Sequence, residues 1–333
     1  MKASAIAPAN IALVKYWGKR DEELILPFNG SISVTLDKLF AHTTVEFDER
    51  YKEDILILNG KRVEQSSKDY QEYIGNFLRK FRERFGKTPK VKIESVTNFP
   101  TGAGLASSAA GFAALATAIN EALGLNLDKK ELSKLARLGS GSATRSIYGG
   151  FVEWLKGERN DGEDSYAIQI APPEHWKEFR MILCITSKEE KKIKSRAGMA
   201  QTVKTSPMYK CWLESVEKDL EDVRAGILGK DLELVGKVAE HNCLKMFATM
   251  LTTKPPIIYW NETSIRLIHS ILEWRDEGIK CYFTMDAGPQ VKVICLEKDE
   301  GKIRERLKEI EGVEDIIVTS PGDGAKVTEK HLF

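Results

Sequence analysis

The first part of the chain consists of short apolar segments separated by turns. Residues 4–14 are almost continuously apolar, and residues 31–36 alternate apolar with polar side chains. Two further short segments, 43–47 and 55–58, are bounded by turns, which is the pattern of strands. The second of these ends at Asn59-Gly60, a strong hairpin signal. We therefore predict a strand-rich beginning with a hairpin after residue 58.

Helical patterns follow. Residues 69–85 predict a charged amphipathic helix, and 91–96 alternate like an edge strand. Residues 103–123 are apolar on all sides, which is typical of a buried helix. A last helix is expected over 129–138, with Asp128 as its N-cap and Gly139 after its end.

After residue 174 the pattern starts again. A buried strand at 181–186 precedes a basic loop at 188–194, and the rest predicts helices at 207–225, 232–250, 261–277 and 302–310 and strands at 281–285, 291–296 and 316–319. This order indicates an α+β arrangement, with helices laid on an antiparallel sheet. We expect two domains, 1–178 and 179–333, with a ligand cleft between them.

Composition narrows the class of protein. The 333 residues include 50 basic and 49 acidic side chains, a net charge of +1, which gives no support to nucleic-acid binding. The sequence has no apolar run of 18 residues and no secretory signal pattern, so we expect a cytoplasmic protein without a membrane partner. The cysteines are widely spaced, which argues against a zinc site. Their odd number leaves open an intersubunit disulfide, for which Cys211 in a polar segment is a candidate.

The segment 98–111 predicts a phosphate-binding turn. Gly102 and Gly104 allow close approach of the backbone to an anion, and Ser107 and Ser108 lie where the following helix begins. The segment is not a Walker A loop, because no Gly-Lys-Ser/Thr follows. An ordinary helix cap is the alternative. As a phosphate cradle it would comprise Pro100, Thr101, Gly102, Ala103, Gly104, Leu105, Ala106, Ser107 and Ser108.

Two other clusters are suited to anions. Lys15-Tyr-Trp-Gly-Lys19 follows an apolar strand, and aromatic side chains beside cations are typical of a ligand pocket, although a solvated strand end is the alternative. Ser140-Gly-Ser142 presents hydroxyl and N–H donors, and Arg145 can grip a carboxylate or phosphate with two hydrogen bonds. A helix-capping turn is the alternative there.

A single carboxylate, Asp286, follows the apolar strand 281–285 and precedes Ala-Gly. Most such triplets are turns. Beside the protein interior, however, an unpaired carboxylate is costly. Asp286 is therefore expected to have a cation partner or a catalytic task.

Together these segments closely resemble the diphosphomevalonate decarboxylase family of the GHMP kinase superfamily, from residue 7 to about residue 324. The most specific matches are Asn10-Ile-Ala with Lys15-Tyr-Trp-Gly-Lys-Arg-Asp21, Gly104-Leu-Ala-Ser-Ser-Ala-Ala-Gly111, Gly139-Ser-Gly-Ser-Ala-Thr-Arg145 and Asp286-Ala-Gly-Pro289. The resemblance implies a GHMP kinase fold, with an N-terminal ribosomal-protein-S5-like α/β domain and a C-terminal ferredoxin-like α+β domain. It also favours a homodimer.

The resemblance further implies ATP- and Mg²⁺-dependent conversion of mevalonate 5-diphosphate to isopentenyl diphosphate, in the mevalonate route to isoprenoids. Asp286 would orient or deprotonate the 3-hydroxyl, and Lys15 would keep Asp286 ionised. Arg145 and Asn10 would hold the substrate carboxylate, and Ser107 or Ser108 would contact Mg²⁺. The implied substrate-binding residues are Tyr16, Trp17, Gly18, Lys19, Ser140, Gly141, Ser142, Arg145 and Arg196.

Two departures from the family pattern concern the phosphate end of the substrate. Arg196 stands where the family has a substrate-contacting Thr, and an Arg expected after the Asn-Gly hairpin is missing, with Lys68 and Asp69 in its neighbourhood. A phosphomevalonate decarboxylase that uses the monophosphate is therefore an alternative. A mevalonate 3-kinase, another GHMP metabolite kinase and a catalytically silent binding protein are further alternatives.

Overall fold

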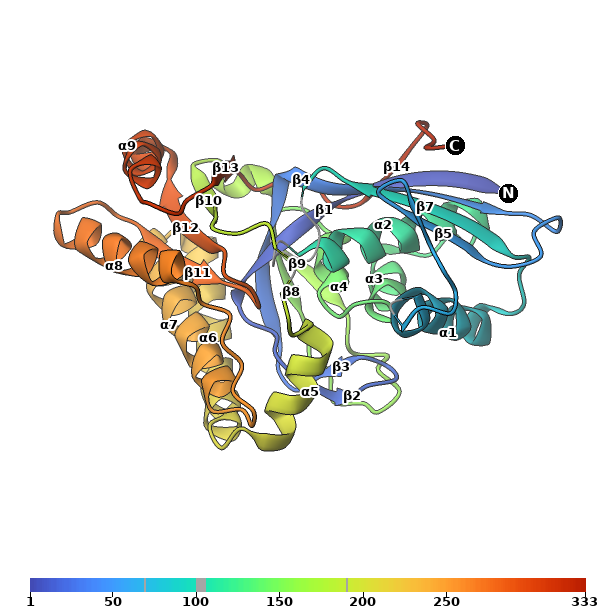
Figure 1. The fold of residues 1–333 in the computed structure, drawn as a ribbon, viewed down its shortest axis with the longest axis horizontal. Helices are drawn as coiled ribbons and strands as arrows, with labels where there is room; N and C mark the ends of the chain where they lie inside the picture. Colours follow the sequence, from blue (N-terminus) through green and yellow to red (C-terminus); the bar gives the residue numbers. More distant parts are fainter. Residues whose placement is uncertain (69, 100–105, 190) are drawn as a thin grey trace.

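The computed structural model describes residues 1–68, 70–99, 106–189 and 191–333, and Figure 1 shows its two halves. The described strands are β1 (Lys2–Val14), β2 (Lys19–Asp21), β3 (Leu26–Pro27), β4 (Ser31–Phe47), β5 (Ile55–Leu58), β6 (Lys61–Val63), β7 (Val91–Thr97), β8 (Phe151–Trp154), β9 (Ala167–Ala171), β10 (Phe179–Ile185), β11 (Tyr282–Met285), β12 (Val291–Leu296), β13 (Asp315–Thr319) and β14 (Lys326–Thr328). The described helices are η1 (Tyr70–Gly75), α1 (Asn76–Phe85), α2 (Ser107–Ala122), α3 (Lys129–Arg137), α4 (Ala143–Ser146), η2 (Pro173–Trp176), α5 (Ser195–Thr205), α6 (Tyr209–Gly229), α7 (Leu232–Leu251), α8 (Glu262–Asp276) and α9 (Glu297–Lys308).

The first half is built on a sheet whose strand order is β14-β1-β4-β7-β5-β6, with β8 paired to β4 and β9 paired to β8. The strand β1 runs antiparallel to β4, and their register shifts between Pro8 and Asn10 and again between Ala12 and Val14. Such irregularities re-aim side chains and are common beside active sites. Here they precede the polar segment that begins at Lys15.

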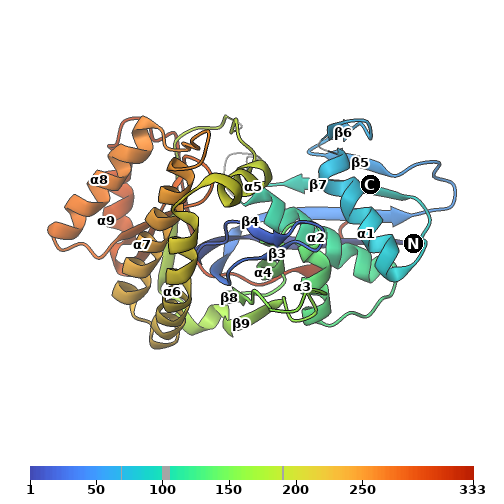
Figure 2. The same cartoon turned by 90° about the horizontal axis from the view of Figure 1, so that it is seen from below.

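Helices α1 to α4 cover one face of this sheet, as both views show (Figures 1 and 2). Helix α2 packs on β1 and β4, and most of its buried residues are alanines. Small side chains let the helix approach the sheet closely. The predicted buried helix is thus confirmed from residue 107 onward, and residues 103–105 lie outside the described part. Asp128 caps α3 as expected, accepting a hydrogen bond from the Glu131 N–H at 2.8 Å.

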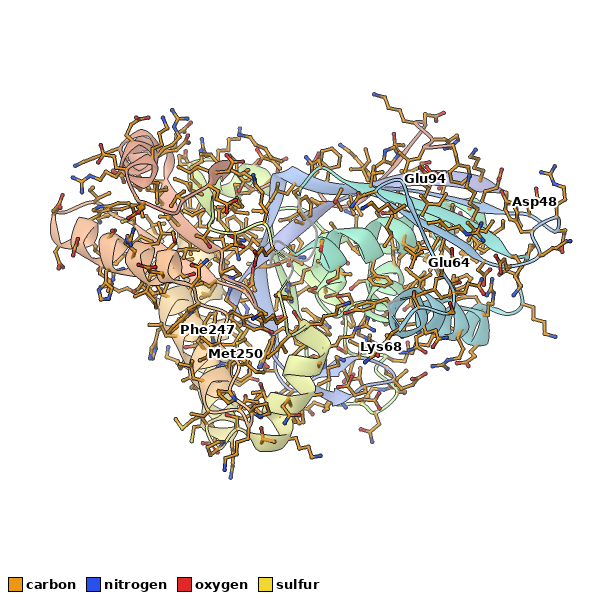
Figure 3. All side chains as sticks on the ribbon, in the orientation of Figure 1. Asp48, Glu64, Lys68, Glu94, Phe247 and Met250 are labelled. Atoms are coloured by element: carbon orange, nitrogen blue, oxygen red, sulfur yellow. The ribbon has the colours of Figure 1, made fainter. Side chains whose placement is uncertain are left out.

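The second half has a four-stranded antiparallel sheet of order β11-β12-β10-β13, with helices packed on it, as the α+β prediction requires. Helix α7 packs against α6, and both helices also contact β1. Phe247 and Met250 of α7, labelled in Figure 3, are buried in this region. Strand β14 returns to the first sheet, where Ser4 is paired with Thr328. Four cysteines are buried, whereas Cys211 is exposed, as expected.

Several sequence expectations need correction. Segments 31–36 and 43–47 are parts of one strand, β4, which runs on between them even though its register with β1 shifts between Pro8 and Asn10. Strand β7 is not an edge strand, since it pairs with β4 on one side and β5 on the other. The helix expected at 69–85 begins with the π-helical turn η1, and residue 69 lies outside the described part. Strands β8, β9 and β14 and helix α5 were not predicted.

None of the helices in the described part of the chain is both long enough and apolar enough to cross a membrane.

Candidate active site

A cavity of about 510 Å³ is lined by residues of both halves. This is the cleft expected from the sequence. Among its described lining residues a single carboxylate, Asp286, is accompanied by six cationic side chains, those of Lys15, Lys19, Arg145, Lys191, Lys194 and Arg196. A cavity with this excess of positive charge favours ligands that carry several negative charges.

Lys15 and Asp286 meet in this cavity from opposite halves, directly after β1 and β11. The Lys15 ammonium donates hydrogen bonds to Asp286 Oδ1 at 2.9 Å and to the Ala12 carbonyl at 2.7 Å. The backbone of Lys15 is also fixed, because its N–H donates to Asn242 Oδ1 and its carbonyl accepts from Asn29 Nδ2, both at 2.8 Å. The ion pair expected from the sequence is therefore present and held in one geometry.

A second cation, Lys292 of β12, lies 3.3 Å from Asp286 Oδ2. Burial raises the pKa of Asp286, but the charges of Lys15 and Lys292 outweigh burial and lower that pKa to about 2. The carboxylate is therefore ionised at neutral pH. Lys292 was not singled out in the sequence, although a lysine inside the apolar strand Val291–Leu296 was a signal.

Arg145 lies on the short helix α4 and is almost completely buried. Its Nε donates to Asn10 Oδ1 at 3.1 Å and to Ser33 Oγ at 2.9 Å, and its Nη1 donates to Ser31 Oγ at 2.5 Å. Burial lowers the pKa of Arg145 to about 10, so it stays charged at neutral pH. Among the described residues Nη2 has no hydrogen-bond partner, and this oriented donor suits a carboxylate.

Asn10 also lines the cavity, but its amide is engaged within the protein. Its Nδ2 donates to the Ser142 carbonyl at 3.0 Å and to Ser146 Oγ at 2.8 Å. Asn10 thus ties β1 to α4 and orients Arg145. Ser31 and Ser33, which share this task, lie two residues apart on one face of β4. The alternating pattern of residues 31–36 predicts a strand but does not indicate this role for the two serines.

The segment Lys15 to Lys19 contributes a buried wall. The ring of Tyr16 packs edge-on against Trp154 at 4.8 Å between centroids. The Tyr16 hydroxyl has no partner among the described residues, and burial raises its pKa. Lys19 forms an ion pair with Glu22, and burial lowers its pKa. Trp17 and Lys19 line the cavity together with Tyr16, whereas Gly18 does not.

Ser140, Gly141 and Ser142 all line the cavity. Ser140 Oγ lies 3.3 Å from Ser108 Oγ and 3.3 Å from Ser142 Oγ, so the three hydroxyls connect the start of α2 with this turn. Gly141 lies so close to Trp154 that a Cβ would be 2.5 Å from the indole ring. The turn therefore requires glycine at this position.

The predicted phosphate loop is described only from Ala106 onward, and Pro100, Thr101, Gly102, Ala103, Gly104 and Leu105 lie outside the described residues. Ala106 has φ of 59°, a left-handed conformation that is uncommon for a residue with a Cβ. No side chain caps α2, and both Ser107 and Ser108 line the cavity. The first N–H groups of a helix without a side-chain cap form a suitable anion site.

Magnesium fits this donor set. Within the described ranges, no three His, Cys, Asp or Glu side chains are grouped so that they could hold a metal. Mg²⁺ prefers oxygen ligands and is commonly bound through substrate phosphates with few protein ligands. The hydroxyls of Ser107 and Ser108 are oxygens of this kind.

Arg196 of α5 reaches across to the first half. Its guanidinium donates to the backbone carbonyls of Glu72 and Gly139 and stacks over the Tyr73 ring at 4.0 Å from the centroid. Burial lowers its pKa. Arg196 thus lies beside the turn that begins at Ser140.

Lys68, labelled in Figure 3, does not line the cavity; its side chain is 84% exposed and lies 3.4 Å from Glu72. It therefore does not replace the Arg that the family pattern has in this neighbourhood. Asp69 lies outside the described residues.

Sequence reasoning missed an apolar part of the cavity. This part lies among η1, β5, β6, β7 and α2 and is lined by Leu56, Leu58, Val63, Ile74, Ile93, Phe112 and Leu115. The sequence predicts the β5–β6 hairpin. That this hairpin and α2 line the same cavity depends on tertiary packing. Leu58 is 42% exposed, which suits an apolar ligand surface.

Comparison with known proteins gives matches over both halves. The family model "Diphosphomevalonate decarboxylase-like N-terminal domain" matches residues 7–167, and "Mevalonate 5-diphosphate decarboxylase C-terminal domain" matches residues 181–320. The diphosphomevalonate decarboxylase of Candida albicans is 39% identical over 358 residues, which cover 99% of each chain.

Solved structures agree. The mevalonate diphosphate decarboxylase of Enterococcus faecalis is 44% identical, covers 99% of both chains and superposes with a TM-score of 0.91. A structure described as MDDEF in complex with MVAPP, AMPPCP and magnesium is 43% identical over 99% of both chains, also with a TM-score of 0.91. Matches of this extent, over a chain that carries the Lys15–Asp286 pair and the buried Arg145, show that the protein belongs to the diphosphomevalonate decarboxylase family.

Proposed function

We propose that this chain catalyses the ATP-dependent decarboxylation of mevalonate 5-diphosphate to isopentenyl diphosphate, with release of ADP, phosphate and CO2. The observation that carries the proposal is the Asp286 carboxylate, paired with Lys15 in a cavity whose other charged residues, among those that the structure describes, are all basic. Relatives named for this reaction, and a related structure described with MVAPP, AMPPCP and magnesium, support it.

At the substrate end, the Arg145 guanidinium binds the carboxylate through Nη2 while Ser31, Ser33 and Asn10 keep it oriented. The diphosphate is bound by the other cationic and hydroxyl groups that line the cavity. These groups are the side chains of Tyr16, Lys19, Ser140, Ser142 and Arg196. Trp17 and Gly141 form part of the cavity wall beside these groups.

At the nucleotide end, the uncapped start of α2 and the hydroxyls of Ser107 and Ser108 bind ATP phosphates. Ser107 and Ser108 would also hold Mg²⁺, which neutralises phosphate charge during phosphoryl transfer. The apolar part of the cavity, including Leu56, Ile74 and Phe112, accommodates the base.

The chemistry follows from these positions. Asp286 accepts a hydrogen bond from the 3-hydroxyl of the substrate and thereby directs the hydroxyl oxygen toward the γ-phosphorus of ATP. A new P–O bond forms between these two atoms as the bond from the γ-phosphorus to ADP breaks. With a pKa of about 2, Asp286 is a weak base, so it takes the proton only as the hydroxyl becomes acidic during bond formation. The 3-phosphate then departs with the C–O electron pair, and the bond to the carboxylate breaks to form CO2 and the new double bond.

The test is CO2 release and ADP formation with mevalonate 5-diphosphate, mevalonate 5-phosphate and mevalonate as separate substrates. We expect equimolar ADP and CO2 with the diphosphate and much lower kcat/KM with the other two. A preference for the monophosphate would make the chain a phosphomevalonate decarboxylase. ADP formation without CO2 would contradict decarboxylation and favour a kinase.

We further propose a division into domains 1–178 and 179–333, a homodimer, and a cytoplasmic location. The change of sheet at Phe179 supports the division, whereas β14 (Lys326–Thr328) of the second part returns to the sheet of the first. The homodimer and the location rest on the family relationship alone. Sedimentation equilibrium tests the dimer, and the same measurement with and without reductant tests whether the exposed Cys211 joins two subunits.

A further inference from the structure

Lys292 is an unusual residue for its place in the fold. It lies on β12, between β11 and β10, with Thr284 and Leu183 as its neighbours across the two ladders. Its side chain has no exposure to solvent. Burying an ammonium is unfavourable unless a counter-charge is close. Packing within the sheet alone therefore does not explain a lysine at this position.

The counter-charge is the Asp286 carboxylate, at 3.3 Å from Oδ2. The other oxygen, Oδ1, accepts from Lys15 at 2.9 Å. Each carboxylate oxygen thus faces its own cation, and the two cations come from different sheets, Lys15 after β1 and Lys292 on β12. The plane of the carboxylate is fixed by both halves of the molecule.

The charges in this place do not balance. Lys15, Lys292 and Arg145 are three basic side chains around a single carboxylate. Burial lowers the pKa of Lys292 and of Arg145, and the negative charge of Asp286 opposes that shift, which favours their charged forms. If Lys292 were neutral, Asp286 would neutralise Lys15. With Lys292 present, the charge of Lys15 remains available to a phosphoryl group, whose oxygens carry spread negative charge during transfer.

We propose that Lys292 is a positioning residue for the phosphorylation step: it holds Asp286 Oδ2, which fixes the carboxylate and leaves the Lys15 ammonium for the transferring phosphoryl group. This inference rests on the proposed function. It assigns to Lys292 no contact with substrate, because its ammonium is fully buried behind Asp286.

The test is Lys292→Met, which keeps the length of the side chain and removes the charge. We expect kcat to fall by about 10- to 100-fold, with KM for ATP and for mevalonate 5-diphosphate changed less than about threefold. Lys292→Arg, which keeps the charge, should recover part of the lost kcat. The groups that face Asp286 are Lys15, Lys292, Arg145 and the buried thiol of Cys243. Removing one cation raises the pKa of the carboxylate, so the acid limb of kcat should move to higher pH.

Lys134→Met is the matched control. Lys134 is also buried and ion-paired, with Glu131 and Glu163, but it does not line the cavity. Its loss should lower the free energy of unfolding and leave kcat and its pH profile unchanged. Equal kcat and an unshifted acid limb in folded Lys292→Met would overturn the proposal. If Lys292→Met does not fold, Lys292→Arg alone provides the test. A kcat and an acid limb that both match those of the wild type support the role of charge. A loss of kcat equal to that of Asp286→Asn contradicts it. Absence of CO2 release by the wild type would instead contradict the proposed function itself.

Discussion

The Tyr209 hydroxyl donates a hydrogen bond of 2.8 Å to the Trp17 carbonyl and occupies the space beside Gly18. Tyr209 begins α6 of the second half, whereas Trp17 belongs to the wall of the cavity. Gly18 has φ of +109°, and a Cβ there would lie 1.9 Å from the Tyr209 hydroxyl oxygen. This contact fixes the segment from Lys15 to Lys19 against the other half of the molecule.

Gly18→Ala is therefore expected to lower the free energy of unfolding by about 2–4 kcal/mol and to reduce kcat strongly, because Tyr209 must move and the backbone is strained. Gly60→Ala is the matched control. Gly60 also has positive φ, +76°, but a Cβ there would meet nothing within 4 Å. Gly60→Ala should lower the free energy of unfolding by only about 1 kcal/mol. Urea unfolding of both variants separates the two effects, and equal costs would show that the Tyr209 contact is unimportant.

Asp286→Asn should abolish turnover, with kcat reduced by about 10³-fold or more, while nucleotide binding is largely kept. The amide cannot take the proton, and it faces Lys15 and Lys292 without a negative charge. Single-turnover ADP formation and equilibrium binding of a fluorescent ATP analogue measure the two quantities. Substantial phosphoryl transfer by the variant would remove Asp286 from the catalytic role.

Arg145→Gln should reduce CO2 release by about 10²-fold or more, because the carboxylate loses its charged partner. Ser33→Ala removes only one acceptor that orients Arg145, at 2.9 Å from Nε, so about a tenfold loss is expected. CO2 release is measured against ADP formation for each variant. Turnover of Arg145→Gln close to that of the wild type would place the carboxylate elsewhere.

Arg196→Thr restores the residue that the family pattern has at this position. Arg196 contacts Glu72, Tyr73 and Gly139 beside the Ser140 turn. Because the proposed function places its charge at the diphosphate, the variant should raise KM for mevalonate 5-diphosphate about tenfold and change KM for ATP little. Tyr73→Leu is the control, because it removes the stacked ring from the cavity wall and keeps the charge of Arg196. An unchanged KM in Arg196→Thr would give Arg196 a purely structural role between the halves.

The sequence predicted most of the elements and the residues that meet in the cavity. The strong signals were local: the Asn59-Gly60 hairpin between β5 and β6, the Asp128 cap of α3, and the apolar segments that became β1, β10 and β12. The polar groups that follow β1 and β11 also meet as expected. Local patterns are enough to predict the position of a side chain when its residue directly follows a buried strand.

What the sequence did not predict depends on tertiary packing. An alternating segment such as 91–96 fits an edge or an inner strand equally well, and only the parallel pairing with β5 makes β7 an inner one. In the sequence, Lys292 is a single lysine within an apolar strand. Its role becomes apparent only because Asp286, at the end of β11, lies beside it in the fold. Ser31 and Ser33 acquire a role only because α4 brings Arg145 onto β4.

Asp54 does not line the cavity, and it provides a pH-dependent test of stability. Its two carboxylate oxygens accept hydrogen bonds from Arg82 at 2.7 Å each, and Oδ1 also accepts from the Val91 N–H at 3.0 Å. Burial raises the pKa of Asp54, but these hydrogen bonds outweigh burial and lower the pKa below its ordinary value of 3.8.

Because the pKa of the folded state is the lower one, the stabilisation by Asp54 is fully present above the unfolded pKa and is lost as pH falls through the folded pKa. Asp54→Asn should therefore lower the free energy of unfolding by about 1–3 kcal/mol at pH 7 and by less at pH 3, where part of the stabilisation is already lost. Glu53→Gln is the control, since the Glu53–Arg62 pair at 2.7 Å is about half exposed and is worth only about 0–1 kcal/mol. Urea unfolding of the three proteins between pH 3 and 7 measures the difference. A cost for Asp54→Asn that stays constant over this range would show that the charge of Asp54 contributes nothing.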